Sequence, residues 1–125
     1  MSSEENAKQN TVVLDKDLAL ENMGGDENLL KEVLVIYQEE APKKMCNLHT
    51  AIEESDSEGI MCAAHSLKGA SANIGAVSVR DIASEIEMAG RDKRISAITE
   101  LVDRLHEELC RLDSLIADEI EADKK

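Results

Sequence analysis

The strongest constraint on the fold is the spacing of apolar residues between positions 30 and 52, which recur at steps of three and four. Such steps place side chains on one face of an α-helix. The register runs through Pro42, although a proline inside a helix costs on the order of 3 kcal/mol. We therefore expect the helix to kink or to restart in phase there, and not to turn away. The stripe is Leu30, Leu34, Tyr37, Ala41, Met45, Leu48 and Ile52.

Three later segments show the same periodicity. A third helix is predicted from about residue 57 to 74, with Ser55 and Glu58 at capping-box spacing and Gly75 as a left-handed stop. Ser78 is predicted to cap a fourth helix that Gly90 closes. A long last helix follows. The predicted buried faces are Ile60, Ala63, Ala64, Leu67, Ala70, Ser71 and Ile74; Val79, Ile82, Ala83, Ile86 and Ala89; and Ile95, Ile98, Val102, Leu105, Leu109, Leu112 and Ile116.

The N-terminal part is predicted to hold one short helix. Residues 1–12 are polar and without periodicity, which is typical of a disordered lead-in. Asp15 is placed to cap a helix from Lys16 to Met23 that the following glycine pair ends, and Asp26 can cap the next helix.

These segments predict an all-α chain, an antiparallel up-and-down four-helix bundle with the short N-terminal helix across one end. The bundle domain is expected over 13–120, followed by a charged tail over 121–125. Apolar residues make up 42% of the chain but aromatic residues only 1%, so the core must be aliphatic. Met23, Met45 and Met88 are predicted to fill it.

The net charge of −13 disfavours nucleic acid and anionic membranes as partners, since both would be repelled. Neither a signal peptide nor a membrane-spanning run is present in the sequence, so we expect a cytoplasmic protein. We also expect it to be a monomer.

Three cysteines without a paired motif (Cys46, Cys62 and Cys110) indicate free thiols and no metal site. His49 and His106 are interpreted as surface or boundary histidines without a ligand partner.

His65 differs from those two histidines in its surroundings. It lies roughly 160° from the centre of the buried stripe of its helix, which predicts exposure. An idle surface histidine is the simpler reading. However, the residues expected around it are small or apolar where an acidic protein should carry Glu and Lys, which favours a surface that another protein approaches closely. The predicted partner-binding residues are Met61, Cys62, Lys68, Gly69, Ala72 and Arg91.

Two neighbours of His65 point to chemistry. Gly69 costs about 0.5–1 kcal/mol relative to alanine inside a helix, and one turn beyond His65 it removes a side chain beside the imidazole. Lys68 can place an ammonium near an anion attached to the ring, as a phosphoryl group would require. A histidine nitrogen is itself a competent nucleophile.

The run from His65 to Gly69 (H-S-L-K-G), followed by Ser71 and the I-G-A sequence at 74–76, closely resembles the phosphoacceptor motif of histidine-containing phosphotransfer (HPt) domains of bacterial two-component phosphorelays. The resemblance covers roughly 14–116. It implies a four-helix bundle, phosphorylation of His65, charge stabilisation by Lys68, and access for the phosphate donor at Gly69.

The resemblance also implies a polar side chain on the neighbouring helix that hydrogen-bonds the imidazole. Glu87, with Arg91 four residues later, matches that place, although an ordinary exposed glutamate is the alternative. The implied partners are receiver domains of response regulators, or a hybrid histidine kinase. The receiver would supply Mg²⁺, and this chain would need no cofactor. It would be a phosphocarrier without turnover of its own and not an enzyme.

Two other functions remain open at this stage. The chain could be a helical adaptor that binds a partner through the face around His65 without accepting phosphate. A hydrolase that uses His65 as nucleophile or base is a weaker candidate, because no second catalytic group is visible.

Overall fold

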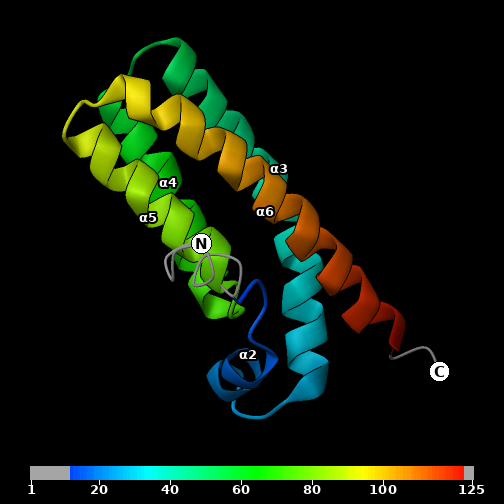
Figure 1. Ribbon diagram of the computed structural model, residues 1–125. Coiled ribbons are helices and arrows are strands. Elements are labelled where there is room, and N and C mark those ends of the chain that lie inside the picture. The colour runs from blue at the N-terminus through cyan, green and yellow to red at the C-terminus, as the bar shows by residue number, and fades with distance from the viewer. Residues whose placement is uncertain (1–11, 123–125) are drawn as a thin grey trace, which may run out of the picture.

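The computed structural model describes residues 12–122, in which all regular secondary structure is helical. The predicted lead-in, apart from Val12, and the last three residues of the predicted tail lie outside the described range. Helices α3 to α6 stand side by side, each against the next, and α6 returns against α3, while α2 lies at one end (Figure 1). The predicted fold class is confirmed. The helices are α2 (Lys16–Asn22), α3 (Glu27–Glu53), α4 (Ser57–Asn73), α5 (Val77–Arg91) and α6 (Ile95–Ala122).

The core is aliphatic, as the composition predicted, and the four long helices each contribute one stripe to it. Helix α3 is continuous through Pro42 and keeps its register on both sides of that residue. At the end of α3 the predicted stripe is off by one position, because Ala51 is buried and Ile52 only half-buried. Met88 was wrongly assigned to the core and is 51% exposed, because it lies on the outer side of α5.

Aspartate side chains cap the first three of these helices. Asp15 and Asp26 each accept a hydrogen bond from a backbone N–H three residues later, as predicted. The prediction for α4 was wrong by one residue: Asp56 is the N-cap and accepts from the Gly59 N–H at 3.0 Å. Ser55 instead takes a left-handed conformation (φ 53°) in the turn before the cap.

The ends of α5 also differ from the prediction. The helix begins two residues earlier, after Ala76, and no side chain caps it. Ser78 is buried, and its hydroxyl donates to Glu108 of α6 at 2.8 Å. Gly90 does not close the helix but lies buried within it against α4, and the turn that follows uses Lys93 in a left-handed conformation (φ 57°).

Gly75 joins the N-terminal helix to the bundle. It has φ 71°, which confirms the predicted left-handed stop, and its carbonyl accepts the Asp15 N–H at 2.7 Å. The side-chain amide of Asn22 donates to the carbonyls of Ala72 and Asn73 at 3.4 and 3.2 Å. These bonds satisfy carbonyls at the end of α4, and they fix α2 across that end of the bundle.

Candidate phosphotransfer site

His65 lies on the outer side of α4, and its side chain is 68% exposed. Its Nδ1 atom is 3.1 Å from Oε2 of Glu87, which reaches across from α5. Within residues 12–122 no hydrogen bond involves the other ring nitrogen, Nε2. The exposed imidazole is therefore held on one side only, and its second nitrogen is available to a molecule that approaches from outside.

Glu87 joins His65 to Lys68. Its other oxygen, Oε1, accepts a hydrogen bond from Nζ of Lys68 at 2.7 Å, and the carboxylate is only 12% exposed. The bond from Lys68 is the main reason why the pKa of Glu87 falls below its ordinary value; burial opposes this, and the charge of Lys68 and the contact with His65 add to it.

The charge state of Glu87 determines the tautomer of His65. An ionised carboxylate can only accept hydrogen bonds, so Nδ1 of His65 must carry the proton in their contact. In the neutral ring the lone pair then lies on Nε2. Arg91, one turn after Glu87 on α5, places Nη2 4.0 Å from Oε2, which is the outer limit of an ion pair. Its guanidinium is largely exposed, so it adds little to the energy of this cluster.

Gly69 leaves open space beside the histidine. A Cβ atom built at this position would meet no atom within 4 Å. Packing within residues 12–122 therefore gives no reason for a glycine here, although a glycine destabilises a helix interior.

The other predicted contact residues also belong to α4 and differ in exposure. Cys62 is exposed, whereas Met61 and Ala72 are half-buried. Met61 is turned toward α5, where its Cγ would be 3.2 Å from a Cβ placed on Gly90. Along α4 these residues flank His65 with small or apolar side chains. We call the set His65, Met61, Cys62, Lys68, Gly69 and Ala72 the His65 face.

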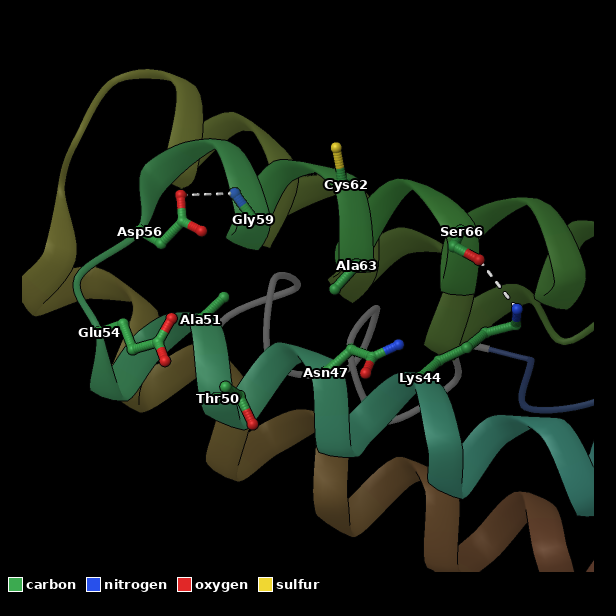
Figure 2. A pocket seen from close by; sticks show the side chains of 10 residues that line it. All are labelled: Lys44, Asn47, Thr50, Ala51, Glu54, Asp56, Gly59, Cys62, Ala63 and Ser66. Carbon is green, nitrogen blue, oxygen red and sulfur yellow. Dashed lines mark hydrogen bonds between the residues drawn. The ribbon is translucent and has the colours of Figure 1, made fainter.

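A groove of about 350 Å³ runs between α3 and α4 beside this face. Figure 2 shows Asn47 and Thr50 on its α3 side and Cys62 on its α4 side. At one end Lys44 donates to the hydroxyl of Ser66, the neighbour of His65, at 2.9 Å. A second cation thus lies near the helix that carries His65, on the side opposite Glu87.

The inner face of α4 is fixed by a buried polar contact. The hydroxyls of Tyr37 and Ser71 lie 2.8 Å apart, between α3 and α4. Burial raises the pKa of Tyr37 to about 12, so the phenol stays neutral at physiological pH. Ser71 was predicted on the buried side, and Tyr37 gives its hydroxyl a partner there.

No helix within residues 12–122 is long and apolar enough to cross a membrane. In the same range no cluster of three or more His, Cys, Asp or Glu side chains could hold a metal ion.

Comparison with known proteins identifies the family. A family model described as the Hpt domain matches residues 32–115. This chain belongs to the Hpt family. That membership makes it a phosphotransfer protein of two-component signalling, a class of phosphocarriers. Comparison with curated proteins gave no match.

Two solved structures share the fold. Histidine-containing phosphotransfer protein B (HptB) from Pseudomonas aeruginosa PAO1 is similar with a TM-score of 0.82 and 23% identity, over 88% of this chain and 96% of that one. The HPT domain of an Hpt sensor hybrid histidine kinase from Shewanella has a TM-score of 0.77 and 23% identity, over 88% and 95%. These likenesses concern the arrangement of helices.

Two contacts of this Hpt domain were not foreseen in the sequence. The ion pair between Lys68 and Glu87 spans two helices, and only the packing of α4 on α5 brings it about. The second contact joins His49 of α3 to His106 of α6, which had been interpreted as unpartnered. Their positions, 57 residues apart, become neighbours because α3 and α6 are antiparallel.

Proposed function

We propose that this Hpt domain accepts a phosphoryl group on Nε2 of His65 from the phosphorylated aspartate of a receiver domain, and passes it to the aspartate of another receiver. The observation that carries this proposal is the contact of Nδ1 of His65 with Glu87 at 3.1 Å. This contact supports a ring whose bound nitrogen carries the proton and whose exposed nitrogen carries the lone pair.

In the transfer step, the lone pair of Nε2 attacks the phosphorus atom and forms a P–N bond. The bond between phosphorus and the aspartyl oxygen breaks, and the carboxylate leaves with the electron pair. The Nδ1 proton stays on the ring, where the carboxylate of Glu87 stabilises the positive charge that develops as the P–N bond forms. Return of the phosphoryl group is the same step in reverse. We place the Mg²⁺ ion for this step on the receiver.

Lys68 has a different part in the proposal. A phosphoryl group on His65 brings about two negative charges to the surface of an already acidic protein. The ammonium of Lys68, held by Glu87 at 2.7 Å, is one turn from the ring and stabilises these charges. The shortness of the flanking side chains, above all at Gly69, lets the receiver bring its aspartate close to the ring.

Phosphotransfer from a purified, phosphorylated receiver to the full chain tests the proposal. We expect a label on the parent protein that acid removes and base does not, as is typical of a phosphoramidate, and no label on His65→Gln. His49→Gln is the matched control, because it removes another exposed histidine, and it should be labelled like the parent. A labelled His65→Gln protein would overturn the assignment. Receiver binding without labelling of the parent, unchanged in His65→Gln, would favour the adaptor.

Two further variants separate charge from access. Lys68→Ala should slow transfer or shorten the lifetime of the phosphohistidine, whereas Lys43→Ala, which removes an equal charge from the exposed side of α3, should do neither. Gly69→Gln should block transfer while the helix content stays unchanged, because the added side chain enters space that the chain itself leaves empty. Normal rates in both test variants would contradict the roles given to these residues.

A further inference from the structure

The two histidines outside the His65 face form a pair on the surface of the bundle. His49 of α3 and His106 of α6 are both exposed, and their Nε2 atoms lie 2.9 Å apart. The ring centres are 5.0 Å apart with an angle of 21° between the ring planes. Because the nitrogens are closer than the ring centres, the two rings converge at their Nε2 ends.

This distance suits two ligands of one metal ion. Imidazole nitrogens bind first-row divalent ions at about 2.0–2.1 Å, so two of them at right angles around one ion lie about 2.9 Å apart. Right angles between neighbouring ligands belong to the square-planar and octahedral geometries of Cu²⁺ and Ni²⁺. In the hydrogen-bonded pair the two Nε2 atoms point toward each other. Both rings must therefore turn about their Cβ–Cγ bonds to direct both lone pairs to one point outside the bundle.

The proton between the two rings does not prevent binding. In the hydrogen-bonded pair one Nε2 carries a proton and the other accepts it. Coordination by both nitrogens requires the first ring to move its proton to Nδ1, a change of tautomer that solvent can mediate. The net charge of −13 also raises the concentration of cations around the protein.

We propose that His49 and His106 form a two-imidazole site for a divalent transition-metal ion, with Ni²⁺ and Cu²⁺ as the ions of best-matched geometry. Water fills the remaining positions, since no third protein ligand completes a cluster within residues 12–122. A bound ion bridges α3 and α6. The His65 face and Glu87 belong to α4 and α5, so the ion lies away from the phosphotransfer site.

Calorimetric titration of the untagged chain with Ni²⁺ at neutral pH tests this site. We expect one ion per chain. His49→Gln and His106→Gln should each weaken binding at least about tenfold, because even the loss of a group that only supports a metal ligand costs that much. His65→Gln is the matched control, since it removes an exposed histidine elsewhere, and it should bind as the parent does.

Thermal unfolding gives an independent measurement. Ni²⁺ should raise the unfolding midpoint of the parent and of His65→Gln, because an ion that binds only the folded chain stabilises it. At the same Ni²⁺ concentration the two pair variants should show a smaller rise, because they bind the ion more weakly. Equal Ni²⁺ affinity in the parent and both pair variants would overturn the proposal, as would the absence of saturable binding to the parent. A Cys46→Ser, Cys110→Ser double variant that loses binding while the pair variants keep it would move the site to the thiols and also overturn it.

Discussion

Substitution of glycine by alanine should raise the stability of the folded state at Gly69 and lower it at Gly24 and Gly75. Gly69 is inside α4 with φ in the helical region and has no atom within 4 Å of an added Cβ. Gly24 has φ 66° and equally open surroundings. Gly75 has φ 71°, and an added Cβ would crowd the backbone carbonyl of Asp15. The three positions therefore separate helix propensity, backbone strain and steric contact.

The expected magnitudes follow from these surroundings. Gly69→Ala should raise the free energy of unfolding by about 0.5–1 kcal/mol through helix propensity. Gly24→Ala should lower it by about 1–2 kcal/mol, since an alanine resists a left-handed conformation. Gly75→Ala carries the same backbone cost. It also disturbs the 2.7 Å hydrogen bond from Asp15, which is worth about 0.5–1.5 kcal/mol, so the total is about 1.5–3.5 kcal/mol before any crowding.

Urea unfolding of the chain, monitored by far-ultraviolet circular dichroism, measures these differences. The free energy of unfolding of a domain of this size is expected to be about 5–15 kcal/mol. Each of these changes is therefore a measurable fraction of that free energy. If Gly75→Ala were no less stable than Gly24→Ala, the close contact between Asp15 and the turn after α4 would not hold α2 in place. A destabilised Gly69→Ala protein would show that the open space at Gly69 is filled in solution.

Three other substitutions test the core and the site. Tyr37→Phe should lower stability by about 1–3 kcal/mol in urea unfolding, because the hydroxyl of Ser71 stays buried without its partner; an unchanged midpoint would contradict this. The lowered pKa of Glu87 stabilises the folded state above the ordinary glutamate pKa, and this contribution disappears as pH falls. Glu87→Gln should therefore show a shallower loss of stability than the parent on acidification below about pH 5; equal slopes would exclude a specific role of Lys68. Gly90→Leu should cost about 1–3 kcal/mol by overpacking α5 on α4; a neutral effect would show that the two helices separate easily.

Periodicity predicted the helices well because burial alone determines which face of each helix is apolar. The helical register across Pro42 follows from that pattern of burial. The left-handed conformation of Gly75 was predictable for another reason, because it depends on local chain geometry. Two of the predictions failed where chemically suitable groups competed for one role. Asp56 displaced Ser55 as the cap of α4, because both can accept the hydrogen bond. Ser78 became buried instead of capping, because Glu108 of another helix offers its hydroxyl a partner.

In the candidate site, too, some features could be predicted from the sequence and others could not. The H-x-x-K-G spacing placed His65, Lys68 and Gly69 on one helix, where spacing determines proximity. Contacts between helices depend on the relative height of two helices in the bundle, which a single sequence leaves open. The ion pair from Glu87 to Lys68 and the pairing of His49 with His106 both have this origin.

Gly90 affects more than stability, because it lies where α5 packs on α4. The distance between these two helices determines which side chains can make contact across them. Gly90 lies in this interface, where a Cβ would already be 3.0 Å from the side chain of Ile60. Helix axes approach each other as closely as the contact side chains allow. The hydrogen bond between His65 and Glu87 spans this gap, so the small size of Gly90 helps to set the distance between the two side chains. Any change that thickens this interface should alter the tautomer and reactivity of the imidazole without touching it.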